Sequence, residues 1–460
     1  MERMCGCIVQ WYVLLYSNFY KKTSADRRTN RRNRMNHEKT FALKGDIVYT
    51  AAPGGFTVVE QGYAVCENGR SAGVFGRLPE QFDGIHVEDC GQKLIIPGLV
   101  DLHLHAPQYS FRGLGMDLEL LDWLETHTFP EEARFCDLDY AKRAYTLFAD
   151  ALSRGATTRA CVFATVHVPA TLCLMELLER TGIRAMVGKV NMDRNCPDSL
   201  REQSAAVSLG ETRRWLEGCA GKFKNVSPIL TPRFIPSCTD ELMRGLGALQ
   251  QATGLPVQSH LSENHSEIEW VQQLCPESAF YGDAYDRFGL FGGGCPTIMA
   301  HCVHSSAAEI DLMKRRGVFI AHCAASNMNI CSGVAPVRTY LARGMNVGLG
   351  TDVAGGFSDS VFRAMSDAIQ ASKLRWRLTD DSLAPLTVSE AFYLGTKGGG
   401  AFFGKVGSFE AGYEFDALVI DDAGLPHPQP LTPVERLERV VYLSDDRHIS
   451  GKYVAGVRVR

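Results

Sequence analysis

The sequence predicts an α/β fold, namely a (β/α)8 TIM-type barrel with a small flanking β domain built from both ends of the chain. Between residues 94 and 353, apolar segments of about five residues alternate with amphipathic stretches of helix length, which is typical of a parallel sheet covered by helices. On either side of this region, short apolar segments are interrupted by glycine and proline, which is typical of small strands. One barrel domain can account for most of the 460 residues, of which 45% are hydrophobic.

Eight apolar segments of the central region are the expected barrel strands. They are centred on residues 95–104, 156–163, 185–190, 227–231, 256–259, 297–300, 318–321 and 347–350. Helical patterns fit between most of them, for instance over residues 139–153 and 200–218. A barrel of this kind carries its active site at the C-terminal ends of the strands, so the polar residues at those ends are the informative ones.

The chain divides into three expected parts. Residues 1–40 are expected to be a poorly ordered N-terminal extension, because the apolar run 7–15 is too short for a membrane span and lacks the charge order of a signal peptide. A targeting role is the alternative for this segment. Residues 41–93 and 405–460 are expected to pair into one composite β domain of small antiparallel strands, and residues 94–404 to form the barrel.

The composition is that of an ordinary soluble protein. The formal net charge is −4 and 22% of the residues are charged, so no basic field for nucleic acid is present, and no apolar run suits a membrane. The 15 cysteines show no C-x-x-C spacing and lie mostly in apolar runs. Reduced, buried thiols and a cytoplasmic location are therefore expected.

Metal-binding residue types stand at the ends of four expected strands. The sequence His103-Leu104-His105 ends the first strand, and residues two apart in a strand point to the same face. The others are His260 after the fifth strand, His301 after the sixth and Asp352 after the eighth. Imidazole and carboxylate ligands suit zinc, with iron as the less favoured alternative. We expect His103, His105, His260 and Asp352 to bind one metal, with one long carboxylate contact.

The motifs around these residues resemble the amidohydrolase superfamily. The run 96–105, IPGLVDLHLH, resembles its opening motif, and Ser259-His260, Ala300-His301 and Gly350-Thr351-Asp352 resemble its later motifs in the same order. The resemblance covers residues 41 to 460. In detail the chain is similar to the guanine deaminase family, in the stretches 121–132, 187–190, 231–234, 259–264 and 350–356. One departure is Ala324, where that family more often has proline, and a looser loop is expected after the seventh strand.

A second metal is not expected. Members of the superfamily with two metals commonly use a carboxylated lysine at the end of the fourth strand, but here that strand ends in Arg233. Lys189 on the third strand is the nearby lysine, and we expect it to form a structural ion pair with a neighbour such as Asp193.

The resemblance implies hydrolysis of guanine to xanthine and ammonia by a zinc-activated hydroxide, in purine catabolism. Three catalytic residues are expected. Asp352 takes the proton of the water and passes it to the leaving amine, and Glu263 protonates ring nitrogen N3. His301 is either a fourth ligand or an orienting group, and the resemblance favours the second. The alternative for Glu263 is an N-cap or surface acid of the next helix.

The purine is expected to contact both the metal site and a separate recognition set. The guanidinium fork of Arg233 suits the O6 and N7 edge of guanine, although a bridge to a barrel acid is the alternative. Gln108 is expected to bind the purine through its amide. The full expected contact set is His105, Ala106, Pro107, Gln108, Arg233, Phe234, His260, Glu263 and Asp352. The resemblance also implies a homodimer.

Three other functions compete with this hypothesis. The nearest is another aminohydrolase of the same superfamily, acting on an adenosine-like thioether, on 8-oxoguanine or on a triazine. The residues that disfavour it are Arg233 and the stretch 123–132. A non-catalytic barrel scaffold is disfavoured because all five metal-type residues are present. A cytidine deaminase type of zinc site is excluded, since the H-x-E at His86 is followed by no P-C-x-x-C.

Overall fold

The computed structural model describes residues 40–460, so the predicted extension lies almost entirely outside the described residues. Each of the eight predicted strand segments contains a strand, and the eight strands form two parallel sheets of four. The first sheet comprises, in order, β5 (Leu99–His105), β6 (Thr157–Phe163), β7 (Arg184–Gly188) and β9 (Val226–Pro228). The second comprises β11 (Val257–Leu261), β12 (Thr297–His301), β13 (Phe319–His322) and β14 (Asn346–Leu349).

Backbone hydrogen bonds link the two sheets on both sides. On one side, the Gln258 N–H donates to the carbonyl of Leu230 at 3.0 Å. On the other, the Asp352 N–H donates to the carbonyl of His103 at 2.8 Å. The short strands β8 (Val190–Asn191) and β10 (Thr231–Pro232) pair in parallel between β7 and β11. The arrangement is of the TIM-barrel type, and it brings the ends of the first and last strands together.

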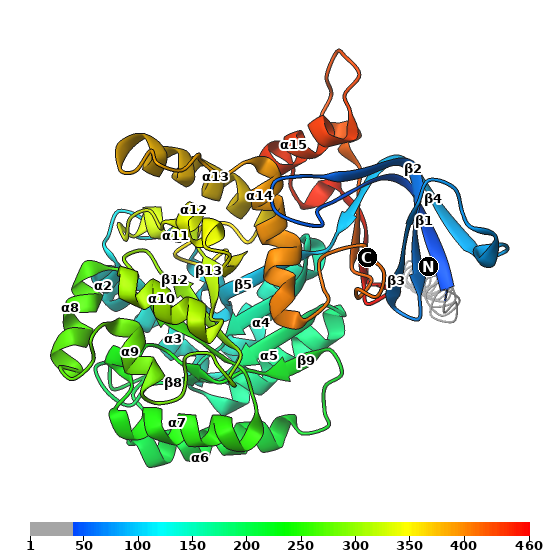
Figure 1. The fold of residues 1–460 in the computed structure, drawn as a ribbon. Coiled ribbons are helices and arrows are strands. Elements are labelled where there is room, and N and C mark those ends of the chain that lie inside the picture. The colour runs from blue at the N-terminus through cyan, green and yellow to red at the C-terminus, as the bar shows by residue number, and fades with distance from the viewer. Residues whose placement is uncertain (1–39) are drawn as a thin grey trace, which may run out of the picture.

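Helices follow most of the strands and surround the two sheets (Figure 1). The main ones are α4 (Leu138–Arg154), α5 (Val168–Thr181), α6 (Ala205–Cys219), α7 (Asp240–Thr253), α8 (His265–Leu274), α9 (Tyr281–Asp286), α10 (Ala307–Arg316), α12 (Val337–Ala342), α13 (Val361–Leu378), α14 (Val388–Tyr393) and α15 (Pro433–Leu443). Helix α4 matches the predicted helix within one residue at each end. Helix α6 begins later than predicted, because the Ser204 side chain accepts the Val207 N–H and caps the helix there. No helix of the described part is long and apolar enough to span a bilayer.

Two segments have a different structure from the one expected. The expected first strand is divided at Gly98, where the chain leaves one sheet for the other. A Cβ atom at this position would lie 2.3 Å from the Thr158 hydroxyl oxygen, so only glycine fits the crossing. The expectation of a looser loop after the seventh strand is wrong, because the residues after Cys323 form the short helix α11 (Ala324–Asn329).

A seven-stranded sheet combines strands from both ends of the described chain, in the order β17-β16-β15-β4-β1-β2-β3. Its strands are β1 (Thr40–Tyr49), β2 (Thr57–Glu67), β3 (Arg70–Phe75), β4 (His86–Pro97), β15 (Ala417–Ile420), β16 (Ile449–Val454) and β17 (Val457–Arg458). Figure 1 shows it beside the helix-covered strands. The expectation of wholly antiparallel pairing is wrong for β4, which runs parallel to β1. The chain crosses over between β3 and β4, and β4 then leads directly into β5.

A buried ion-pair network joins this sheet to the barrel strands. Arg159 on β6 binds Asp416 through two hydrogen bonds, from Nε at 2.5 Å and from Nη2 at 2.8 Å. The same Nη2 donates to Glu414 at 2.8 Å, and Arg184 on β7 reaches Glu414 at 2.8 Å. Arg159 and Asp416 are both buried, so each charge depends on the other.

The substitution Arg159→Met is expected to lower the free energy of unfolding by about 3–5 kcal/mol, because it leaves the Asp416 charge buried without its partner. The urea midpoint, followed by circular dichroism, measures the loss. Arg214→Met is the matched control, since Arg214 pairs with Glu211 on the surface, and its effect is expected to stay within about 0.5 kcal/mol. Equal midpoints for the two variants would show that the network does not hold the sheet in place.

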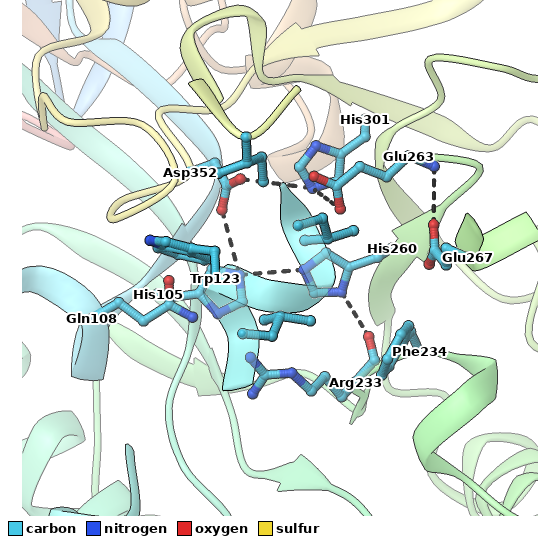
Figure 2. Close-up of a pocket in the computed structure, with 13 residues that line it drawn as sticks. His105, Gln108, Trp123, Arg233, Phe234, His260, Glu263, Glu267, His301 and Asp352 are labelled. Carbon is cyan, nitrogen blue, oxygen red and sulfur yellow. Dashed lines mark hydrogen bonds and ion pairs between the residues drawn. The ribbon is translucent and has the colours of Figure 1, made fainter. Parts of the chain in front are cut away.

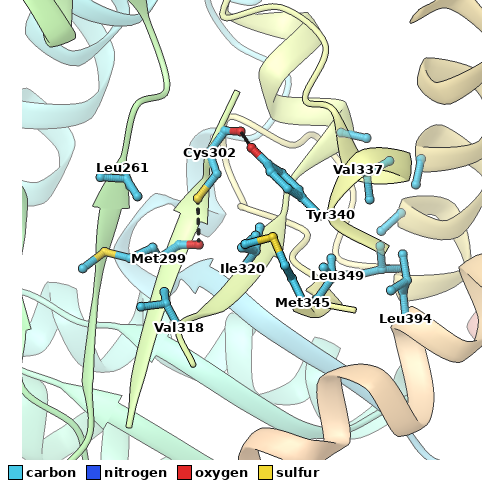
Figure 3. Close-up of a cluster of buried hydrophobic side chains, with 14 of the residues drawn as sticks. Leu261, Met299, Cys302, Val318, Ile320, Val337, Tyr340, Met345, Leu349 and Leu394 are labelled. Atoms are coloured by element: carbon cyan, nitrogen blue, oxygen red, sulfur yellow. Dashed lines mark hydrogen bonds between the residues drawn. The ribbon is translucent and has the colours of Figure 1, made fainter. Parts of the chain in front are cut away.

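The apolar core between β12, β13, β14 and the helices fixes the chain where β12 ends (Figure 3). The hydroxyl of Tyr340 donates to the carbonyl of Cys302 at 2.5 Å, and the Cys302 thiol donates to the carbonyl of Met299 at 3.7 Å. Burial raises the pKa of the Cys302 thiol well above its usual value, so it stays a neutral core side chain. These contacts hold the backbone on either side of Cys302, immediately after His301.

Candidate active site

A cavity opens where the C-terminal ends of the strands meet, and Figure 2 shows the side chains that point into it. It is lined by His105, Gln108, Leu120, Trp123, Leu124, Arg233, Phe234, His260, Glu263, Glu267, His301, Ile330 and Asp352. Eight of these residues belong to the set expected from the sequence to be catalytic or to contact substrate. His103 lies buried beside them, whereas Ala106 and Pro107 begin the 3-10 turn Ala106–Phe111 and do not line the cavity.

Three histidines and one aspartate bring their polar atoms to a common point. The Nε2 atom of His105 lies 3.2 Å from that of His103 and 3.3 Å from that of His260. The Oδ1 atom of Asp352 lies 3.2 Å from His103 Nε2 and 3.4 Å from His105 Nε2. A metal bound at about 2.0–2.1 Å by tetrahedral ligands separates them by about 3.3 Å. The geometry therefore fits one metal ion, and the sets His103–His105–His260 and His103–His301–Asp352 each form a potential metal-binding group.

The protein environment keeps these four groups in the state that binds metal. Burial lowers the pKa of His103, and burial together with the neighbouring His103 lowers those of His105 and His260 well below the usual value. For Asp352, burial opposes ionisation, but the surrounding imidazoles, His103 foremost, hold the pKa below its usual range. Neutral imidazoles and a carboxylate then direct lone pairs at one point, which is favourable only around a cation.

Two of the histidines are oriented by contacts on the side away from the common point of the ligand atoms, one with a backbone carbonyl and one with a carboxylate. The carbonyl of Arg233 lies 2.6 Å from Nδ1 of His260, which fixes the Nδ1–H tautomer and directs Nε2 toward the other ligands. Asp101 accepts the backbone N–H of His103 at 3.2 Å and that of Thr351 at 3.0 Å. The Thr351 hydroxyl donates to the same carboxylate at 2.6 Å, so Asp101 ties the end of β5 to the segment that carries Asp352. Sequence reasoning assigned Asp101 no role.

Glu263 lies beside His301 in a buried position. Its Oε2 atom is 3.4 Å from Nε2 of His301, and its Oε1 atom accepts the Ser332 hydroxyl at 3.2 Å. Burial, together with the charge of Asp352, raises the pKa of Glu263 well above its usual value. The protonated form of this carboxyl group is therefore favoured over the ionised form. The alternative that Glu263 is a surface acid is wrong, because its side chain lines the cavity.

His301 stands between the two acidic side chains. Its Nε2 atom faces Glu263 and also lies 3.7 Å from Asp352 Oδ2, while its Nδ1 atom lies 2.8 Å from the Asn327 side-chain oxygen. Asn327 is on α11, so the segment with the unexpected alanine supports the site after all. The ring is thus held by Asn327, with Nε2 directed at both acids.

Strained backbone marks the strand ends that carry these groups. His301 has φ 72°, Asp352 has φ 47° and Ser262, directly before Glu263, has φ 46°. Non-glycine residues rarely adopt this left-handed region, and the strain is kept only where the surroundings over-determine it. At all three positions it turns the chain sharply at a strand end and directs the polar side chains into the cavity.

On the wall of the cavity opposite Glu263 and His301 (Figure 2), one carboxylate binds both Arg233 and Gln108, the two residues expected to recognise the purine edge. Nη1 of Arg233 donates to Oε2 of Glu132 at 2.6 Å, and Nε2 of Gln108 donates to Oε1 of Glu132 at 2.9 Å. The oxygen of Gln108 accepts the Ala354 N–H at 3.1 Å. The alternative of a bridge between Arg233 and an acid is therefore confirmed, although Arg233 also lines the cavity. Phe129 lies under the guanidinium, with the Arg233 Cζ atom 5.2 Å from the ring centroid.

The sequence analysis did not predict the apolar wall or two acids, Glu132 and Glu267. Leu120, Trp123 and Leu124 come from α2 (Leu120–Trp123) and the π-helical turn Leu124–Thr128, and α3 (Phe129–Ala133) follows at once with Glu132. The stretch 121–132 was noted only as a family resemblance. Glu267 accepts the Glu263 N–H at 3.1 Å and the Tyr281 hydroxyl at 2.7 Å. Burial raises the pKa of Glu267 to about 7. The available signal was its position four residues after Glu263, in the first turn of α8 (His265–Leu274).

Lys189 forms the expected structural ion pair, but with a different partner. Its Nζ atom binds Glu202, not Asp193, and the lysine is fully buried. Asp193 instead accepts the N–H and the hydroxyl of Thr239. The lysine is thus held by a carboxylate away from the histidine cluster.

Comparison with known proteins agrees with this geometry. Residues 94–459 match the Amidohydrolase family. The chain is 41% identical to the guanine deaminase of Dictyostelium discoideum, over 81% of this chain and 84% of that protein. The crystal structure of the guanine deaminase from C. acetobutylicum with bound guanine superimposes with a TM-score of 0.89 at 49% identity, covering 92% of this chain and all 100% of the other. The E. coli guanine deaminase structure gives a TM-score of 0.80 at 31% identity, covering 92% and 99%. The chain belongs to the amidohydrolase family, in its guanine deaminase branch.

Proposed function

We propose that this chain hydrolyses guanine to xanthine and ammonia in the cavity at the strand ends. The observation that carries the proposal is the pair of acids on either side of His301. The surroundings favour the protonated form of Glu263 and the ionised form of Asp352, next to the buried histidine cluster. Hydrolytic deamination needs one group of each kind. Guanine as substrate is supported by the relatives, which include a guanine deaminase solved with guanine in its active site.

The proposed cofactor is one zinc ion per chain. His103, His105, His260 and Asp352 would hold it, and their spacing and charge states suit a divalent cation. Iron is the alternative that the same ligands allow. When bound, the metal lowers the pKa of water and so makes hydroxide available at neutral pH. A second metal has no support, because Lys189 is committed to Glu202.

The two acids and His301 divide the proton transfers between them. Asp352 accepts a proton as the oxygen of water adds to C2 of guanine, while Glu263 donates its proton to N3. Asp352 then passes its proton to the amine, the C2–N bond breaks and ammonia leaves. Glu263 regains a proton from the new C2 hydroxyl, which becomes the carbonyl of xanthine. His301, held by Asn327, orients the attacking water between the acids.

The opposite wall is proposed to hold the purine edge. Arg233 has donors left beside the one that binds Glu132, and the Gln108 amide is fixed by Glu132 and Ala354. Phe234 lines the same wall. The reacting end of the base would meet the groups around the metal. The remaining proposed contacts are His105, His260, Glu263 and Asp352, with Ala106 and Pro107 contributing behind His105.

The proposed organisation places this site in one closed (β/α)8 barrel. The two four-stranded sheets and the hydrogen bonds between them support the closure. We propose residues 94–404 as the barrel domain and residues 41–93 with 405–460 as the composite β domain. A homodimer, a cytoplasmic location and a role in purine catabolism are proposed from the family resemblance. The free state of every cysteine in residues 40–460 agrees with a reducing compartment.

Ammonia release from a panel of free bases tests the function directly. The purified, zinc-loaded protein is expected to act on guanine much faster than on 8-oxoguanine, adenine or an adenosine thioether, because Arg233 and Gln108 match the guanine edge. Xanthine should form in equal amount to ammonia, as measured by its ultraviolet absorbance. Preference for any other member of the panel would contradict the proposal, and light scattering on the same sample gives the oligomeric state.

A further inference from the structure

Glu132 occupies a position that the proposed reaction does not use. Both of its carboxylate oxygens are occupied, one by Arg233 and one by Gln108, and its side chain is almost completely buried. It comes from the short helix α3, which also supplies Phe129 beneath the Arg233 guanidinium. One turn of helix therefore holds Arg233 by charge and by ring contact, and holds Gln108 by a hydrogen bond.

The contacts of Gln108 set which end of its amide faces which way. The side-chain nitrogen donates to Glu132 and the side-chain oxygen accepts the Ala354 N–H. Glutamine can be turned about its last bond, so an amide without such contacts presents either end. With both ends assigned, one N–H and one lone pair remain for a ligand in a fixed direction. The chain of hydrogen bonds runs from Arg233 after β10 to Ala354 after β14, across the wall of the cavity.

Glu132 also provides the negative charge that pairs with Arg233. Within residues 40–460, Glu132 is the carboxylate that forms an ion pair with Arg233, and both groups are shielded from water. A buried guanidinium without this partner would attract an anion strongly. Guanine is neutral near neutral pH, whereas xanthine is the stronger acid and is partly anionic there. An uncompensated arginine would therefore favour the product over the substrate.

We propose that Glu132 is a positioning residue that also cancels the charge of Arg233, so that the cavity selects neutral guanine over anionic xanthine. The inference rests on the proposed function and deepens it. Glu132 acts through Arg233 and Gln108 and not on the reacting atoms. It thereby fixes the positions of Arg233 and Gln108, which bind the edge of guanine, and it lowers the affinity of the cavity for xanthine.

Glu132→Gln separates this role from a purely structural one. In either orientation the new amide nitrogen would face one of two donors, Arg233 or Gln108, and Arg233 would keep its charge without a counter-charge. We expect the KM for guanine to rise by about tenfold or more, while the inhibition constant for xanthine falls by about tenfold. A merely disordered pocket would weaken both ligands together. Parallel weakening, or no change in either constant, would overturn the inference.

Glu132→Asp keeps the charge but shortens the side chain by one methylene. It is expected to raise the guanine KM without tightening xanthine, and it serves if the glutamine variant does not fold. Tighter xanthine binding by this variant would contradict charge compensation. Glu131→Gln is the matched control on the same helix, since Glu131 contacts Tyr140 and not the cavity, and both constants should stay at wild-type values. Absence of guanine turnover by the wild-type protein would instead refute the proposed function itself.

Discussion

Glu263→Gln is expected to fold and to keep its metal, yet to lose guanine turnover by about 10²–10⁴-fold. The carboxyl group lies in a fully buried position, where burial and the charge of Asp352 raise its pKa well above the usual value. The shift favours the protonated form, from which a proton can be donated to the purine. Glutamine keeps the shape and the contacts to His301 and Ser332, but it cannot give a proton away.

Metal content, turnover and guanine affinity measured on one preparation distinguish the possible roles. An inactive protein that retains zinc and still binds guanine agrees with a general acid, because Arg233 and Gln108 are untouched. Loss of zinc would make Glu263 a ligand or the support of one. Glu269→Gln is the control for the same chemical change on α8, since Glu269 is exposed, and it should leave all three quantities at wild-type values.

The strand-end residues were predictable because their positions follow from short-range rules. Side chains alternate along a strand, so His103 and His105 had to share a face, and parallel strands end at the same edge of a sheet. Hence His260, His301 and Asp352, each directly after an apolar run, could be placed near them without any knowledge of the turns. The structure brings these residues within hydrogen-bonding distance of one another or of Glu263.

The wall that faces them could not be predicted in this way. Glu132 and Arg233 are separated by 101 residues in sequence, and Glu132 lies after the π-helical turn Leu124–Thr128, whose hydrogen bonds shift the helical register. No periodicity rule gives the direction of a side chain after such a turn. Asn327 is similar, because its contact with His301 depends on α11, a helix of only six residues. The identity of the partner of Lys189 also depended on tertiary packing that sequence spacing does not determine.

The composite β sheet was also predictable only in part. The composite sheet had a sequence signal in the short apolar segments at both ends, but the parallel pairing of β4 with β1 had none. Pairing direction depends on where the connection runs, and here the segment between β3 and β4 returns the chain to the other side of β1. The need for glycine at position 98, where the expected strand is divided, follows from the close approach of Thr158, which only the folded structure shows.

His103→Ala is expected to abolish both metal binding and guanine turnover. His103 is completely buried, and its Nε2 atom lies 3.2 Å from both His105 Nε2 and Asp352 Oδ1, at the centre of the proposed ligand set. Removing it leaves two imidazoles and one carboxylate with a gap between them, and loss of a ligand from a zinc site typically removes the metal.

Elemental analysis of the purified proteins measures the effect. The wild-type chain should carry about one zinc and His103→Ala close to none, with turnover below detection. His322→Ala is the matched control, because His322 is an equally buried strand-end histidine outside the ligand set. It should lose stability through the cavity it creates but retain its zinc. Retention of zinc by His103→Ala would remove His103 from the ligand set, and two tightly held metals in the wild-type chain would refute the mononuclear site.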